Sequence, residues 1–255
     1  MLVAVAGKDV IGVLAETTAA IRASLDGLAD WGPAGTRPGQ YFSDLAADEA
    51  ALRVLDAAGF GVLSEESGVH APERDVLVVV DPVDGSTNAS RGIPWFATSL
   101  CALDRDGAFA ALVVNQATGQ SFGAVRGEGA WRDDGDGDRR EVRPTSSTSM
   151  RASVVLLSGF PARHLGWKQF RALGAAALDL CAVASGIADA WVDCSKDAHG
   201  PWDYLGGMLV CMEAGAAVAD LHGRDLVARE HEARRTPVAA ATSELLDEVV
   251  RAIRS

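Results

Sequence analysis

Apolar residues recur along the chain in two periods, and each period predicts a different kind of element. Over Asp9–Leu28, and again over Ser43–Ala58, they are spaced three and four residues apart, which is typical of helices with one buried face. Short apolar runs follow at Gly61–Ser64 and Val76–Val80, and runs of this length predict buried strands. The glycine- and proline-rich segment Trp31–Gln40 is expected to be a loop between the two helices.

The middle of the chain has the pattern of an antiparallel sheet. Three apolar runs, separated by short turns, cover Phe96–Leu103, Ala108–Asn115 and Ser121–Val125. Consecutive strands joined in this way form a meander, so residues 1–140 are expected to form helices on a largely antiparallel sheet. The charged segment Asp133–Arg140 is interpreted as a loop near the boundary with a second half, residues 141–255.

The second half mixes strand and helix patterns, which predicts an α/β arrangement. Its predicted strands are Ser153–Leu157, Ala188–Val192, Ala217–Ala219 and Val238–Ala241. Its predicted helices are Trp167–Leu173, Ala175–Ser185, Tyr204–Ala214 and Ser243–Ile253.

Length, composition and charge narrow the class of protein. A chain of 255 residues can bury a large core, and 27 glycines with 48% hydrophobic residues suit closely packed α/β layers. The net charge of −12 argues against a nucleic-acid partner, because binding a phosphate backbone requires a basic face. A small phosphorylated ligand remains compatible with this charge, since bound cations can reverse the local field.

The cysteines and the N-terminus indicate an intracellular protein. Cys101, Cys181, Cys194 and Cys211 form no Cys-x-x-Cys pair and are mostly surrounded by apolar residues, so we expect core thiols in a reducing cytosol. The first residues, Met1–Ala6, lack the basic region of a signal peptide. No apolar run reaches the roughly 18 residues of a membrane span, so we expect a cytoplasmic protein with no membrane partner.

The segment Asp81–Asn88, with the sequence Asp-Pro-Val-Asp-Gly-Ser-Thr-Asn, carries the most specific chemistry. It directly follows the apolar strand, where two carboxylates are costly to bury without a cation. Gly85 permits a tight turn, and the hydroxyl and amide groups after it stand where a helix would begin, which is a site suited to anions. Asp-Pro or Asp-Gly alone would favour a simple turn, but the whole combination predicts a metal-dependent phosphate site.

Carboxylates also occur at the ends of three other predicted elements. They are Asp44 near the start of the second helix, Glu65 after the first strand, and Asp203 in a Trp-Asp pair followed by small residues. Together with the Asp81 motif, these features occur in the same order as in the inositol monophosphatase family of lithium-sensitive, magnesium-dependent phosphomonoesterases, which the chain resembles from about Asp9 onward.

The resemblance implies a fold, a cofactor and an activity. The fold would be a layered α/β/α/β/α sandwich, usually found as a homodimer. Two to three Mg²⁺ ions per subunit, with Mn²⁺ as a substitute, would serve the hydrolysis of a small phosphate monoester by a water that the ions activate. The ligands implied for the ions are Glu65, Asp81 and the main-chain carbonyl of Val83 at the first site, Asp81, Asp84 and Asp203 at the second, and Asp44 with Glu65 at the third.

The resemblance also implies how the phosphate and the water are held. The phosphate would accept N–H groups of Gly85 and Ser86, and the attacking water would be oriented by Glu65 and by the Ser86 hydroxyl with Asp44. Most of the catalysis would come from positioning and charge stabilisation, as is typical of phosphoryl transfer.

The substrate is left open by the sequence. Asp193 stands where family members that hydrolyse inositol phosphates usually have glutamate, and the interval to Asp203 is longer. We expect Asp193, Lys196 and His199 to contact the leaving group. An inositol-phosphate-like, cyclitol or sugar phosphate, histidinol phosphate, a 3′(2′),5′-bisphosphate nucleotide and fructose 1,6-bisphosphate all remain candidates, as does a non-catalytic regulator that retains the fold.

Other acidic and aromatic residues have less specific interpretations. Asp48 is interpreted as a solvated helix position, Glu66 as a capping group or a partner of the ligands, and Trp202 as a packing residue that holds the Asp203 loop. The Asp134–Asp138 run mimics the start of a calcium loop, but Arg139 occupies the position that requires glycine, so we reject a calcium site there.

Overall fold

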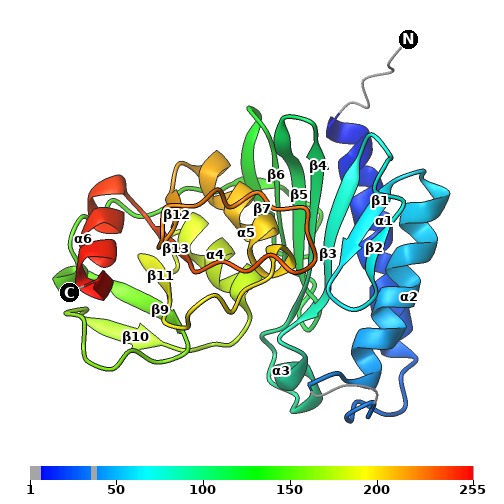
Figure 1. The fold of residues 1–255 in the computed structure, drawn as a ribbon, viewed down its shortest axis with the longest axis horizontal. Coiled ribbons are helices and arrows are strands. Elements are labelled where there is room, and N and C mark those ends of the chain that lie inside the picture. The colour runs from blue at the N-terminus through cyan, green and yellow to red at the C-terminus, as the bar shows by residue number, and fades with distance from the viewer. Residues whose placement is uncertain (1–6, 36–38, 255) are drawn as a thin grey trace.

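Two sheets and the helices around them bury their apolar faces against one another in five layers. The computed structural model describes residues 7–35 and 39–254; Met1–Ala6 and residues 36–38 of the predicted loop lie outside this range. The layers run from α1 (Gly7–Asp26) and α2 (Phe42–Ala57) through the first sheet, α4 (Ala176–Ala184) and α5 (Pro201–Ala214), and the second sheet to α6 (Ser243–Arg254) (Figure 1). The predicted α/β/α/β/α sandwich is therefore confirmed.

The first sheet is the predicted meander with extra strands at both ends. Its spatial order is β2-β1-β3-β4-β5-β6-β7-β8. Only β1 and β3 pair in parallel, and every other neighbouring pair is antiparallel. The strands are β1 (Gly61–Ser64), β2 (Gly68–His70), β3 (Leu77–Asp84), β4 (Ala97–Asp104), β5 (Gly107–Asn115), β6 (Ser121–Val125), β7 (Gly129–Asp133) and β8 (Arg140–Glu141). The pattern missed β2, β7 and β8, whose positions are mostly half-buried or exposed and so lack the apolar runs of the central strands.

Strand β3 continues through the acidic motif instead of ending before it. Its pairing with β4 shifts register between Asp81 and Asp84. This irregularity accommodates Pro82, which has no N–H to give to the ladder, while the Thr98 hydroxyl donates to the Pro82 carbonyl at 2.9 Å. The strand therefore holds both carboxylates rigidly at its end.

The second sheet confirms four predicted strands and corrects one predicted helix. Its order is β10-β9-β11-β13-β12, with β9 (Val154–Ser158), β10 (Gln169–Arg171), β11 (Ala190–Asp193), β12 (Ala217–Asp220) and β13 (Pro237–Ala240), preceded by a short 3₁₀ helix, η1 (Met150–Ala152). The prediction of a helix over Trp167–Leu173 was wrong. This segment instead pairs in parallel with β9 as an exposed edge strand, because in so short a segment tertiary pairing outweighs local propensity.

Three apolar clusters fill the spaces between the layers. The largest surrounds α4 and α5 between the two sheets and includes Trp191 and Tyr204, both fully buried. The others lie under α1 and α2 and under α6. Because α4 is enclosed on all sides, all of its residues are buried.

The close approach of α4 to α5 makes one glycine testable. A Cβ added at Gly207 would lie 2.5 Å from the Leu180 Cβ and 2.9 Å from the Ala177 carbonyl oxygen. Gly207→Ala is therefore expected to lower the free energy of unfolding by about 1–3 kcal/mol through overpacking, measured by urea denaturation. Gly12→Ala is the matched control, because Gly12 lies in α1 with nothing within 4 Å of the added atom and should gain up to about 1 kcal/mol from helix propensity. Equal stabilities of the two variants would contradict this packing.

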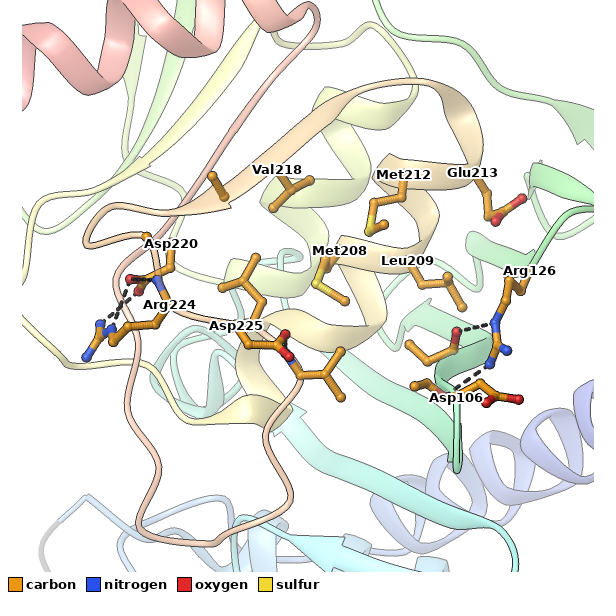
Figure 2. Close-up of a pocket in the computed structure, with 16 residues that line it drawn as sticks. Asp106, Arg126, Met208, Leu209, Met212, Glu213, Val218, Asp220, Arg224 and Asp225 are labelled. Atoms are coloured by element: carbon orange, nitrogen blue, oxygen red, sulfur yellow. Dashed lines mark hydrogen bonds and ion pairs between the residues drawn. The ribbon is translucent and has the colours of Figure 1, made fainter.

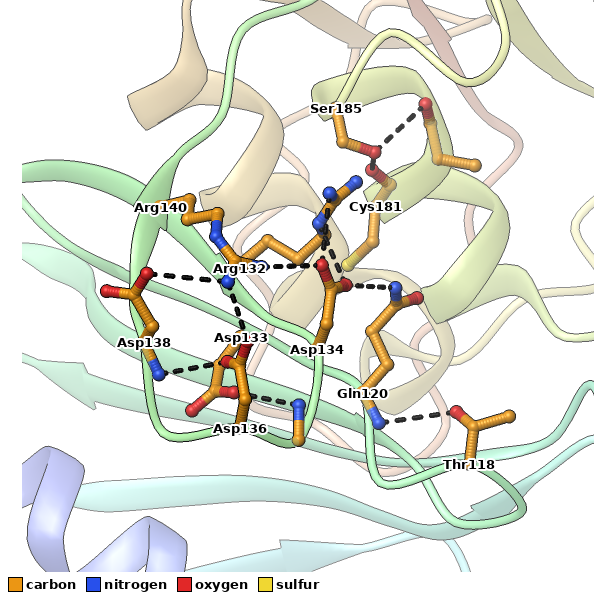
Figure 3. Close-up of polar contacts among 12 residues, drawn as sticks. Thr118, Gln120, Arg132, Asp133, Asp134, Asp136, Asp138, Arg140, Cys181 and Ser185 are labelled. Carbon is orange, nitrogen blue, oxygen red and sulfur yellow. Dashed lines mark hydrogen bonds and ion pairs between the residues drawn. The ribbon is translucent and has the colours of Figure 1, made fainter.

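The charged loop between β7 and β8 is held by arginines (Figure 3). Arg140 pairs with Asp134 at 2.9 Å and with Asp136 at 2.6 Å, and Arg132 lies 3.1 Å from Asp134. The carboxylates that resemble a calcium loop thus have arginine partners. The loop joins two strands of the first sheet, and the division of the chain at residue 140 stays a prediction.

The four cysteines are free thiols, as expected, and three of them are buried. Burial raises the pKa of the Cys101 and Cys211 thiols to about 12. In the part of the chain that the structure describes, no helix is both long and apolar enough to cross a membrane.

Candidate functional site

The parallel pair of strands brings the first acidic residues together. Ser64 at the end of β1 lies opposite Val80 in β3, and the Glu65 N–H donates to the Val80 carbonyl at 3.1 Å. Glu65 and Asp81 therefore follow at the same edge of the sheet. Val83 lies between the two aspartates of the motif, and its N–H donates to the Asp81 carboxylate at 3.1 Å.

Gly85 makes the turn from β3 into the short helix α3 (Ser86–Ser90). Its φ of +85° lies in the left-handed region, which favours glycine. A Cβ at this position would also come within 3.0 Å of the Gly174 carbonyl oxygen and 3.2 Å of the Ala175 Cβ. Both backbone conformation and space therefore require glycine immediately before Ser86.

Two of the carboxylates are oriented by helix N-termini. The Asp84 carboxylate accepts the N–H groups of Ala176 and Ala177 at 3.2 and 2.7 Å, in the first turn of α4. Asp203 lies in the first turn of α5 and accepts the Gly200 N–H at 2.7 Å. Such contacts satisfy helix N–H groups and place negative charge at the positive end of the helix dipole.

A histidine links Asp203 to the second sheet. The His199 Nδ1 lies 3.2 Å from the Asp203 carboxylate, while its Nε2 lies 3.7 Å from Asp193 and 3.1 Å from the Ser158 hydroxyl. Burial opposes protonation of His199, but the hydrogen bond and charge of Asp203 outweigh it and raise the pKa of His199. Asp193 is fully buried, and one of its carboxylate oxygens has no partner among the described residues. Lys196 is exposed on the same loop.

Helix α2 contributes two buried aspartates to the site. Asp44 accepts the N–H of Tyr41 at 2.8 Å. Asp48 accepts the Ser64 hydroxyl at 2.5 Å and is 6% exposed. The interpretation of Asp48 as a solvated position was wrong, because it packs against the end of β1. Glu66 also takes part, since it accepts a hydrogen bond from Gln40.

The predicted carboxylates raise one another's pKa values. Burial and the charge of Asp203 raise the pKa of Glu65 well above its usual value. Burial and the charge of Glu65 do the same for Asp81, and burial and Asp203 for Asp84. Asp44 adds to the repulsion on Glu65 and Asp81. Carboxylates from β3, α2 and α5 and from the turn after β1 thus repel one another in one buried region, which requires protons or cations to be stable at neutral pH.

The donor set has the chemistry of a site for hard divalent cations. Carboxylate and carbonyl oxygens are the ligands that Mg²⁺ and Ca²⁺ prefer, and the carboxylates that the sequence predicted as ligands act on one another here. Within residues 7–35 and 39–254, no three acidic, histidine or cysteine side chains already surround one point. Asp44, Asp84 and Asp203 direct oxygens toward backbone N–H groups, so the ligand assignments stay proposals.

A cavity of about 330 Å³ opens over the acidic edge. Its lining residues are Gly39, Gln40, Asp44, Glu65, Glu66, Ser86, Trp202, His231 and Arg234. His231 Nε2 donates to the main-chain carbonyl of Glu65 at 3.2 Å, and its ring packs on that of Trp202 with 4.9 Å between centroids. Trp202 is buried, as expected for a packing residue.

The sequence interpretation missed His231 and Arg234 as lining residues. They belong to the connection between β12 and β13, drawn in orange-red in Figure 1, which leaves the second sheet and reaches the residue after β1, Glu65. The available signal was a long charged segment between the last two strands, since long loops of this kind are often functional.

A larger cleft of about 550 Å³ lies elsewhere, along the C-terminal part of α5 (Figure 2). Its floor is apolar, with Met208, Leu209 and Met212, and its rim carries charged residues such as Arg126 and Asp225. None of the converging carboxylates lines it, so size alone does not identify the reactive site.

Comparison with known proteins shows which solved structures share this fold and which family the chain belongs to. The structure superposes with a TM-score of 0.78 on the extragenic suppressor protein suhB from Bartonella henselae, at 27% identity, covering 96% of this chain and 99% of that one. The model of the Inositol monophosphatase family matches residues 44–255, and the chain belongs to that family.

Two of the curated relatives are named as phosphatases. The chain is 35% identical over 205 residues to fructose-1,6-bisphosphatase from Pyrococcus furiosus, covering 80% of this chain and 78% of that protein. It is 34% identical over 209 residues to inositol-1-monophosphatase from Mesorhizobium japonicum, covering 73% and 74%. Both relatives are phosphatases by name, and their substrates differ.

Proposed function

We propose that this protein is a magnesium-dependent hydrolase of small-molecule phosphate monoesters. The observation that carries the proposal is the convergence of Glu65, Asp81, Asp84 and Asp203 from different elements beside the Gly85–Ser86 turn. Family membership supports it, because relatives are named as phosphatases.

The acidic residues would hold the cations. Glu65, Asp81 and the Val83 carbonyl would bind a first Mg²⁺, and Asp81, Asp84 and Asp203 a second. Asp44 with Glu65 would support a third. When bound, such ions neutralise the carboxylates, activate water and stabilise charge on the transferred phosphoryl group.

The remaining groups would position the reactants. The N–H groups of Gly85 and Ser86, at the left-handed turn before α3, would bind the phosphate. Glu65, with the Ser86 hydroxyl and Asp44, would orient the attacking water; Asp44, Glu65 and Ser86 line one cavity. Their role is to bring reactants into line before the reaction.

The leaving group would be contacted from the α5 side. His199 is poised there through its bond to Asp203. Asp193 lies behind His199, so it would act on the leaving group by orienting this ring, and Lys196 would act from the exposed part of the loop. We also propose, from the family, lithium sensitivity, a homodimer and a cytoplasmic location.

A panel of phosphate esters tests the proposal. Phosphate release is measured with Mg²⁺, with EDTA, and with Mg²⁺ plus Li⁺, for inositol 1-phosphate, histidinol phosphate, 3′-phosphoadenosine 5′-phosphate and fructose 1,6-bisphosphate. We expect magnesium-dependent release from at least one of them. No release from any ester would shift support to a non-catalytic regulator, and preference for a bisphosphate would favour the nucleotidase or fructose-bisphosphatase alternatives.

A further inference from the structure

One arginine side chain lines the acidic cavity. Arg234 is the only arginine or lysine among the described residues that line it, together with Glu65 and Ser86. It comes from the β12–β13 connection, whereas Glu65 and Ser86 follow strands of the first sheet. Segments attached to both sheets therefore line the cavity. Those of the first sheet bring negative charge, and the connection from the second sheet brings the positive charge of Arg234.

The guanidinium of Arg234 is fixed by uncharged partners. Its central carbon lies 5.0 Å from the centre of the Trp202 ring, and Nη1 donates to the carbonyls of His231 and Ala233 at 2.7 and 2.8 Å. Stacking and two hydrogen bonds through one nitrogen reduce the freedom of a long side chain before any ligand binds. The orientation of Arg234 is thus prepared in advance.

Other arginines of the molecule form ion pairs with carboxylates. Arg224 pairs with Asp220 at 2.8 Å, and Arg140 pairs with Asp136 at 2.6 Å. Within the described part of the chain, the contacts of Arg234 are instead the Trp202 ring and two carbonyls, with no carboxylate within 4.0 Å. Its charge is therefore not neutralised by an ion pair.

We propose that Arg234 determines substrate specificity by binding a second anionic group, a carboxylate or a further phosphate, on the alcohol portion of the substrate. This inference rests on the proposed function, in which the phosphate to be cleaved lies at Gly85 and Ser86. A guanidinium binds such oxygen pairs in a bidentate manner. A cavity of about 330 Å³ is within the range of small-molecule sites.

Comparing esters whose alcohol portion carries an anionic group with one whose alcohol portion is uncharged separates this role from general effects on catalysis. Initial rates with Mg²⁺ are measured for fructose 1,6-bisphosphate, for 3-phosphoglycerate and for glycerol 2-phosphate, with the wild type, Arg234→Gln and Arg234→Lys. Arg229→Gln is the matched control, because Arg229 is exposed on the same connection and bonds the Asp104 carbonyl outside the cavity. The first two esters distinguish a second phosphate from a carboxylate.

We expect Arg234→Gln to lower kcat/KM by about 10- to 100-fold for whichever ester with a second anionic group the wild type prefers, the usual effect of losing a charge-assisted hydrogen bond. Glycerol 2-phosphate should change less than about 3-fold, and Arg234→Lys should restore part of the loss. Equal losses for all three esters, or no loss for the two esters that carry a second anionic group, would overturn the proposal.

Binding measurements test the anion site at Arg234 independently of the proposed phosphatase activity. Calorimetric titration of the three esters in Ca²⁺ reports affinity without requiring turnover. A wild type that hydrolyses none of the esters, but binds one with a second anionic group at least about 10-fold more tightly than Arg234→Gln does, would refute the phosphatase and retain the anion site. Equal affinities of the two proteins for every ester would refute the anion site.

Discussion

Asp81→Asn is expected to reduce turnover by about a thousandfold or more while leaving the protein folded. Asp81 lies within β3, a strand buried between two helical layers, and would serve two cations, so its loss would remove charge from both sites. The substitution keeps the shape of the side chain. Asp203→Asn should have a similar effect through the second cation alone.

The same substitution is expected to raise the melting temperature in EDTA. Burial and the charges of Glu65 and Asp84 raise the pKa of Asp81, so its charged form is unfavourable in the cation-free protein and a neutral amide relieves this repulsion. The measurements are phosphate release and calorimetric melting. Asp56→Asn is the control, because Asp56 is an exposed carboxylate paired with Arg74. Near-normal activity of Asp81→Asn would refute its assignment, and a lower melting temperature would refute the repulsion.

The second large effect concerns pH and magnesium. In EDTA, stability is expected to rise as the pH falls from 8 to 5. The folded-state pKa values of Glu65, Asp81 and Asp84 are raised, so the folded protein binds these protons more tightly than the unfolded chain. This contribution is full below the unfolded values near 4 and is lost as the pH rises through the folded values. Burial raises the pKa of Asp179 to about 7, which adds a loss of stability near neutral pH.

Magnesium should cancel this trend. An ion at 100 times its dissociation constant stabilises the folded state by about 2.7 kcal/mol, equivalent to roughly 5–10 °C in melting temperature for a chain of this size. The shift should be largest at pH 8, where the carboxylates are ionised, and small at pH 5. Carboxylates with lowered pKa values, such as Asp220 beside Arg224, stabilise the folded state at higher pH. They lose this stabilising contribution only below about pH 4, outside the range compared. Calorimetry at both pH values, with and without Mg²⁺, makes the comparison, and an equal shift at pH 5 and pH 8 would contradict it.

The sequence was sufficient for the parts of the site that depend on local pattern. The apolar run before Asp81 and the run before Glu65 each predicted a buried strand followed by a carboxylate, although β3 continues past Asp81 to Asp84. The proximity of Glu65 and Asp81 depends on β1 and β3 being parallel neighbours. The family resemblance supplied this arrangement, since periodicity alone does not pair strands.

Other features depend on contacts that no local pattern encodes. The segment at Gln169–Arg171 is a strand because β9 offers it an edge. Asp48 appeared solvated from its neighbours in the sequence, yet Ser64 from a distant strand covers it. His231 and Arg234 reach the cavity only because their connection crosses from one sheet to the other.

The crossing of the β12–β13 connection also sets an order of assembly during translation. Asp44, Glu65, Ser86 and Trp202 are synthesised before His231 and Arg234, and N-terminal parts of a chain generally fold first. A nascent chain paused before residue 231 would lack the wall of the cavity that His231 and Arg234 form, so its acidic edge would be open to solvent. Selectivity for the substrate would therefore be acquired after the capacity to bind cations, within a single round of synthesis.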